Sequence, residues 1–71
     1  MSEEVLAEMV ANVWKIVVNE GDQVAEGETI CILESMKMEI PVEATASGTV
    51  ASISVQEGCT VQEGDVIAVI D

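Results

Sequence analysis

The sequence predicts a small all-β domain, and three observations support that prediction. The chain has 71 residues, enough for a single domain over residues 1–71. Hydrophobic residues make up 49% of it and aromatic residues only 1%, so Val and Ile must build most of the core. These β-branched residues favour strands. The third observation is an internal repeat in which each copy has the pattern strand, loop, strand.

The repeat appears when the sequence is shifted by 37 residues, so that residues 18–27 lie over residues 55–64. Val, Glu, Gly, Val, Glu and Gly coincide in register between these two segments. Two copies are fewer than the roughly three that a solenoid needs. We therefore interpret the copies as the two halves of one domain with an internal pseudo-two-fold axis.

The strands follow from this pattern in order along the chain. A first strand is expected at residues 5–10, although the composition of residues 3–10 also allows a helix. The remaining strands are predicted at residues 13–18, 29–34, 39–44, 49–55 and 66–70.

The two repeated loops carry paired glycines and a central valine. Gly21 and Gly58 occupy equivalent places, which indicates backbone conformations with positive φ, where a Cβ would clash. Val24 and Val61 lie in mid-loop and are expected to hold each loop against the core.

The segment between the halves reads as a half-buried strand. Ile40 and Val42 alternate with polar residues and should share one face. Pro41 cannot donate a hydrogen bond to a neighbouring strand, so this strand is expected at a sheet edge or at a bulge.

The charge balance excludes several classes of function. Fourteen acidic residues face only Lys15 and Lys37, which gives a formal net charge of −12. Binding to nucleic acid depends on neutralising phosphates with Lys and Arg, so we expect no nucleic-acid partner. An anionic membrane surface is disfavoured for the same reason, and no apolar run is long enough to span a bilayer.

The cysteines and the first residues indicate a cytoplasmic protein. The sequence begins without the basic and apolar regions of a secretory signal, so Cys31 and Cys59 should remain reduced. Cys31 lies in an apolar run and is expected to be buried, whereas Cys59 lies in a loop. With two cysteines and no histidine, a structural zinc site is not expected, and no metal is assigned.

The candidate functional site lies between the two halves. Residues 34–39, Glu-Ser-Met-Lys-Met-Glu, leave room only for a tight hairpin that projects Lys37 outward. Met usually fills gaps in cores, so the alternative places Met36 and Met38 in the core and makes Lys37 an ordinary surface charge. One of only two positive charges stands in a turn between apolar residues, which favours a functional site.

This run resembles the attachment motif of biotinyl domains, the biotin carboxyl carrier modules of biotin-dependent carboxylases. The resemblance covers nearly the whole chain, since residues 18–24 are similar to the family's first glycine loop and residues 46–50 and 55–67 to its second half. The short, free-standing biotin carriers are the most similar type. Two departures are the lack of room for a protruding thumb between the halves and the unusual run Met9-Val10-Ala11 before the first repeat.

The resemblance implies a fold and a function. The fold would be a barrel-sandwich hybrid, a flattened β-barrel of two quasi-symmetric four-stranded antiparallel sheets. Lys37 would carry covalent biotin, with Met36 and Met38 flanking it for recognition. A biotin protein ligase would attach the biotin, and the chain, itself non-catalytic, would serve a biotin carboxylase and a carboxyltransferase. We expect a monomer in isolation.

Two alternatives remain. A lipoyl carrier domain of a 2-oxo acid dehydrogenase-type system has the same fold and hairpin lysine, but it usually has Asp before the lysine. The other alternative is an unmodified interaction module. Among the acidic residues no paired-carboxylate site is recognisable, and the absence of His leaves a general-base mechanism without an obvious residue.

Overall fold

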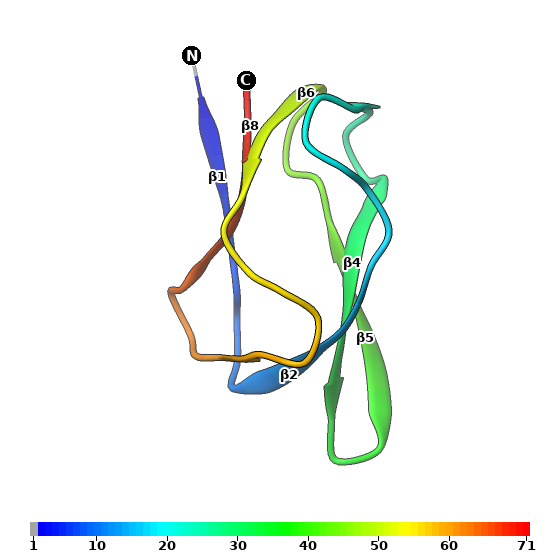
Figure 1. The fold of residues 1–71 in the computed structure, drawn as a ribbon, viewed down its shortest axis with the longest axis vertical. Coiled ribbons are helices and arrows are strands. Elements are labelled where there is room, and N and C mark those ends of the chain that lie inside the picture. The colour runs from blue at the N-terminus through cyan, green and yellow to red at the C-terminus, as the bar shows by residue number, and fades with distance from the viewer. Residues whose placement is uncertain (1) are drawn as a thin grey trace.

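The structure is a computed structural model that describes residues 2–71, and this range contains eight β-strands and no helix (Figure 1). Within these residues no helix is long and apolar enough to cross a membrane. The strands are β1 (Glu3–Leu6), β2 (Ala11–Ile16), β3 (Gln23–Val24), β4 (Thr29–Ser35), β5 (Met38–Glu43), β6 (Gly48–Ile53), β7 (Thr60–Val61) and β8 (Val66–Ile70).

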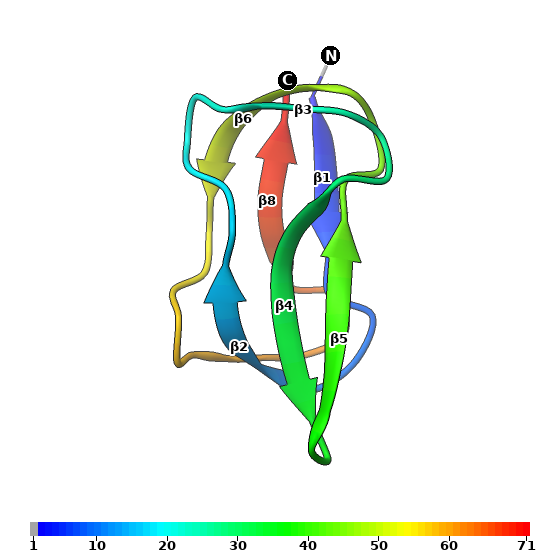
Figure 2. The ribbon, with the colours of Figure 1, turned by 90° about the vertical axis from the view of Figure 1, so that its right-hand side faces the viewer.

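The strands form two four-stranded antiparallel sheets, in the orders β1-β8-β6-β3 and β5-β4-β2-β7. Figure 2 looks onto the outer side of the β5-β4-β2 sheet, with β1 and β8 behind it. This architecture confirms the predicted all-β barrel-sandwich fold.

The hydrogen bonds of the loops repeat between the two halves. The Gly21 N–H donates to the carbonyl oxygen of Val50, and the equivalent Gly58 N–H donates to that of Val13, both over 2.8 Å. Both glycines have the predicted positive φ, 93° and 91°. Each loop is therefore fixed to a strand of the other half, which confirms the pseudo-two-fold axis.

The pairing of strands obeys the same symmetry. Leu33 of β4 pairs with Ile40 of β5, and the equivalent Ile70 of β8 pairs with Glu3 of β1. The β4–β5 pair and the β1–β8 pair each contain one irregularity of register. The two irregularities lie at positions that the repeat makes equivalent. The β1–β8 pair is thus the structural counterpart of the β4–β5 hairpin.

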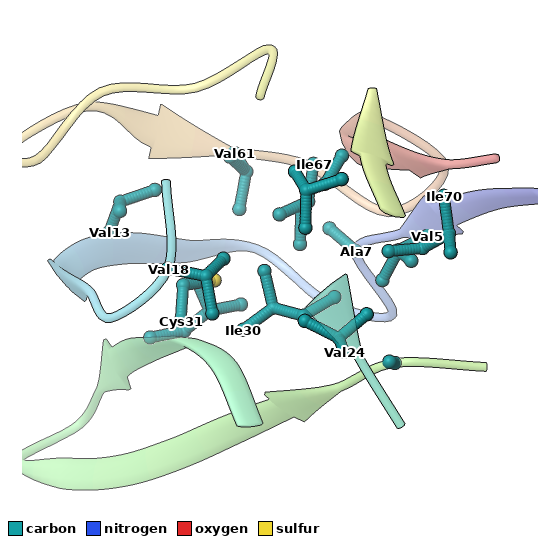
Figure 3. Packing of buried hydrophobic residues seen from close by; sticks show 14 of the residues in the cluster. Val5, Ala7, Val13, Val18, Val24, Ile30, Cys31, Val61, Ile67 and Ile70 are labelled. Carbon is teal, nitrogen blue, oxygen red and sulfur yellow. The ribbon is translucent and has the colours of Figure 1, made fainter. Parts of the chain in front are cut away.

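The core lies between the two sheets and consists of aliphatic side chains and the Cys31 thiol (Figure 3). Val24 and Val61 are both buried, as predicted for the valines of the two loops. Cys31 is also buried and Cys59 is exposed. The most deeply buried side chains are Ile30, Leu33, Ile67, Ile70, Val5, Val13, Val50, Val61 and Cys31.

The first strand differs from its predicted position. It spans Glu3–Leu6 and not residues 5–10, and the helical alternative for residues 3–10 is wrong. Glu3 and Glu4 pair with β8 although both side chains are exposed, because the edge strand needs only one buried face. The Ala7 N–H then donates to the carbonyl oxygen of Asp65, and the chain leaves the sheet towards β2.

Two further strands begin earlier in the structure than the sequence predicted, and for a common reason. β2 begins at Ala11 and β6 at Gly48, both earlier than predicted, because their first residues pair with the short strands. Ala11 pairs with Val61 of β7, and Gly48 pairs with Val24 of β3. A two-residue strand gives no periodic signal, so its effect on its partner cannot be predicted from hydropathy.

Candidate functional site

The β4–β5 hairpin positions the candidate site. Ser35 pairs with Met38, so Met36 and Lys37 alone form the loop. In both ribbon views this loop lies at the end of the molecule opposite the two termini (Figures 1 and 2). β5 is the outer strand of its sheet, as Pro41 predicted, and Ile40 and Val42 turn half-buried side chains towards the core.

The backbone of this loop has an unusual conformation. Met36 has a φ of 53° and Lys37 a φ of 64°. Positive φ at both central residues is the signature of a type I′ turn, which matches the twist of the flanking strands. Such turns normally use Asn and Gly, because a Cβ in the left-handed region costs about 1–2 kcal/mol per residue. The site therefore stores backbone strain that the paired strands hold in place.

This strain was missed by the sequence reasoning, which assigned positive φ only to glycines. A usable signal was present, since two strands separated by only two residues require a primed turn. The residue types concealed it, because Met and Lys have no preference for the left-handed region.

The side chains of the turn project into solvent. Met36 is 91% exposed and Met38 is 64% exposed, and Lys37 is also exposed. The alternative that placed the two methionines in the core is wrong. Both methionines therefore lie exposed beside the lysine, and their role in recognition stays a prediction.

Acidic residues stand at the base of the turn. Glu34 of β4 lies directly opposite Glu39 of β5, and both side chains are exposed. Like charges in this position weaken a strand pair, so they do not help the hairpin to form. They place negative charge on one face of the strand pair, at the base of the turn that carries Lys37.

The site offers a reachable amine at the tip of a hairpin. Over residues 2–71 no group of three or more His, Cys, Asp or Glu side chains is arranged to hold a metal ion. The sequence contains no His that could act as a base for Lys37. An exposed lysine amine on a hairpin loop can be acylated by a separate enzyme that first activates a carboxylic acid.

Comparison with known proteins identifies the family. Residues 3–70 match the biotin/lipoyl family model, described as biotin-requiring enzyme. The chain belongs to this biotin/lipoyl attachment family.

Three relatives show the range of proteins in which similar attachment domains occur. The biotinylated protein TB7.3 homologue of Mycobacterium leprae is 54% identical over 70 residues, which cover 99% of each chain. The biotin carboxyl carrier protein of Streptococcus mutans is 46% identical over 59 residues, 83% of this chain and 45% of that protein. The crystal structure of Kluyveromyces lactis urea carboxylase matches with a TM-score of 0.94 and 39% identity, and the match covers all of this chain and 6% of that one.

The attachment domain contains a second lysine in a different setting. Lys15 is exposed, but it lies within β2, at an irregularity of the pairing with β4. Its amine extends from the face of a sheet and not from the tip of a hairpin. Of the two lysines, only Lys37 stands clear of the body of the domain.

Proposed function

We propose that this chain is a biotin carboxyl carrier in which biotin is joined by an amide to Nζ of Lys37. It then carries a carboxyl group from a biotin carboxylase to a carboxyltransferase. The class of molecule, a non-catalytic biotin carrier domain, follows from the family and from relatives that are biotinylated or are parts of carboxylases. The same relatives favour biotin over a lipoyl group.

The position of Lys37 in the structure is the observation that supports it as the attachment residue. A carrier must present one group to two different active sites, so its attachment point has to be exposed and well supported. The two-residue loop of the β4–β5 hairpin provides both, and the tether raises the local concentration of the carried group at each active site.

The residues of the chain have limited but definite roles in this function. The Lys37 amine, once it has lost its proton to the ligase, attacks the carbonyl carbon of biotinyl adenylate. An amide bond forms between Nζ and the acyl carbon, the bond from that carbon to the phosphate oxygen breaks, and AMP leaves. When attached, biotin supplies the ureido nitrogen that takes up and releases the carboxyl group. The type I′ turn fixes the direction in which the Lys37 side chain leaves the hairpin.

The remaining assignments are also part of this proposal. The partners are a biotin protein ligase, a biotin carboxylase and a carboxyltransferase, and the carrier is a cytoplasmic monomer. A net charge of −12 supports solubility and attraction to basic partner surfaces.

Intact mass spectrometry of the chain purified from its own source tests the proposal. We expect an added mass equal to biotin less one water, together with recognition by streptavidin. Lys37→Arg should abolish both, while Lys15→Arg, the matched control, should leave both unchanged. Biotin that persists in the Lys37→Arg variant would refute the assignment, and an added mass equal to a lipoyl group would establish the alternative carrier.

A further inference from the structure

The outer face of the β5-β4-β2 sheet carries a row of apolar side chains that the core does not use. Ile32 of β4 lies between Pro41 of β5 and Lys15 of β2 in register. Trp14 precedes Lys15 as the extra residue of the bulge after Val13, and its side chain is 50% exposed. The only tryptophan of the chain is therefore presented on a sheet surface.

The other half of the molecule provides an internal control for this row. By the repeat, the equivalent positions on the opposite sheet are Ala51, Ser52, Val69 and Glu4, with Ser52 and Glu4 both paired to Val69. The same strands with the same bulge thus form with small or acidic residues in these places. The fold does not require Trp14 or Pro41, so their presence on one sheet only points to a role outside folding.

Two features of this face suit it to bind another protein. Trp is among the residue types that contribute most to binding energy when they enter a partner's pocket. The exposed acids Glu34, Glu39 and Glu43 lie along the same two strands and form an acidic border. A complementary surface would have an apolar pocket for the indole and basic residues around it.

The row lies close to the lysine that has to be modified. Pro41 is four residues from Lys37, so it lies about 13 Å away along the strand. An interface of ordinary size covers about 800 Å² on each partner, which is wide enough to include both the turn and the row. A protein that receives the hairpin in a cleft would touch this face with the rim of that cleft.

The length of the lysine side chain indicates which of the possible partners must touch this face, and that partner is the ligase. Nζ of an unmodified lysine is about 6 Å from its Cα, because five bonds each advance it by a little over 1 Å. The enzyme that acylates this amine must approach the domain closely. The enzymes that act on the attached biotin meet it at the end of an arm about twice as long, so they can work with the domain farther away.

On the basis of the proposed attachment at Lys37, we propose that the apolar row of Trp14, Ile32 and Pro41 is the docking surface for the biotin protein ligase. The Trp14 indole is the anchor that enters an apolar pocket of the ligase, and the acidic border pairs with basic residues of its rim.

Initial rates of biotin incorporation into the full-length unmodified chain test this surface, with purified ligase, biotin and ATP. Trp14→Ala should raise the KM for the chain about tenfold or more, with kcat within about twofold and the melting temperature little changed. Val69→Ala, which shortens the equivalent residue of Ile32 on the opposite sheet, is the control and should leave KM unchanged. Pro41→Glu, which installs the residue of the equivalent strand, should raise KM without relying on the Trp14 variant.

The outcomes separate this inference from the proposed function. If Lys37→Arg abolishes biotinylation but Trp14→Ala and Pro41→Glu leave the ligation KM unchanged, the docking surface is wrong and the attachment site stands. A loss confined to carboxylation, or a change of oligomeric state in sedimentation, would likewise overturn the assignment to the ligase. If the unmodified wild-type chain takes up no biotin from the ligase, the proposed function itself fails.

Discussion

Glu20 and Glu57 accept equivalent hydrogen bonds, each from a backbone N–H of the other half of the domain. The carboxylate of Glu20 accepts a hydrogen bond from the backbone N–H of Ile53, and that of Glu57 accepts one from the N–H of Ile16, each over 3.0 Å. Each loop thus ties down the strand of the other half at the point where β2 or β6 ends.

We expect Glu20→Ala and Glu57→Ala to destabilise the domain equally, by about 0.5–1.5 kcal/mol each, since each removes one such hydrogen bond. Urea denaturation of the two variants measures this. Glu63→Ala, at an exposed loop position, is the control and should be close to neutral. Unequal losses for the Glu20 and Glu57 variants would show that the two halves do not share the same energetics.

The strain of the attachment turn can be relieved by substitution. Met36→Asn should stabilise the fold by on the order of 0.5–1 kcal/mol, because Asn tolerates the left-handed conformation that Met36 adopts. Met38→Asn, at a neighbouring residue of ordinary φ, should give no such gain. Thermal unfolding of the two variants without biotin measures the change in stability at each position. Equal effects of Met36→Asn and Met38→Asn would contradict the role of strain.

The loop glycines and Gly48 should respond to Ala for different reasons. An added Cβ at Gly21 or Gly58 meets nothing within 4 Å, so only the positive φ opposes it. We expect each loop variant to lose about 1–2 kcal/mol, and the two losses to be equal. Chemical denaturation of the Gly21→Ala and Gly58→Ala variants measures the two losses. A marked difference between them would contradict the equivalence of the loops.

At Gly48 the obstacle is a neighbouring chain segment. A Cβ there would overlap the carbonyl oxygen of Asp71, whose backbone also exchanges two hydrogen bonds with Thr49. Gly48→Ala should therefore destabilise the domain, and the penalty should shrink in a chain that lacks Asp71. A double-mutant cycle measures this coupling, and full additivity would rule out the overlap as the cause.

The buried thiol makes stability depend on alkaline pH. Burial raises the pKa of Cys31 from 9.0 to about 11, because the thiolate loses its hydration in the core. The unfolded chain therefore releases this proton at a lower pH than the folded chain does. The contribution of the neutral buried thiol to the free energy of unfolding is complete below pH 9 and is lost as the pH rises to about 11.

Cys31→Val should flatten the fall in the free energy of unfolding over this alkaline range. Denaturation curves at several pH values for both proteins measure the difference. The exposed Cys59 should react with a thiol reagent in the folded protein, while Cys31 should react only after unfolding. Identical pH profiles for wild type and Cys31→Val would show that ionisation of Cys31 is not the cause of the alkaline loss of stability.

Much of the fold could be predicted because the repeat carries the information twice. Val24 and Val61 were expected in the core because both copies place an apolar residue in mid-loop, and Pro41 marked the edge strand through its missing N–H. The start of β1 was misplaced because its buried face includes only Val5, too few residues to set a period.

The candidate site was located by its residue types but not by its geometry. The exposure of Met36 and Met38 was correctly expected from the turn. The left-handed backbone of Met36 and Lys37 was not, because the strand register imposes it against the preferences of these residues. Trp14 drew no functional interpretation from the sequence, since its direction depends on a bulge that hydropathy does not reveal.

The equivalence of the β1–β8 pair and the β4–β5 hairpin has a consequence for how the chain can be connected. Ser2 Oγ donates to the Asp71 carboxylate over 2.7 Å, so the two ends lie where a turn would join them. A short linker from Asp71 to Ser2 would close the chain into a ring, and a new opening between Met36 and Lys37 would give a circular permutant. The same sheets would then assemble with the order of the two halves reversed, and the lysine would sit at a free end. A permutant that folds but is biotinylated poorly would show that the closed turn serves modification more than folding.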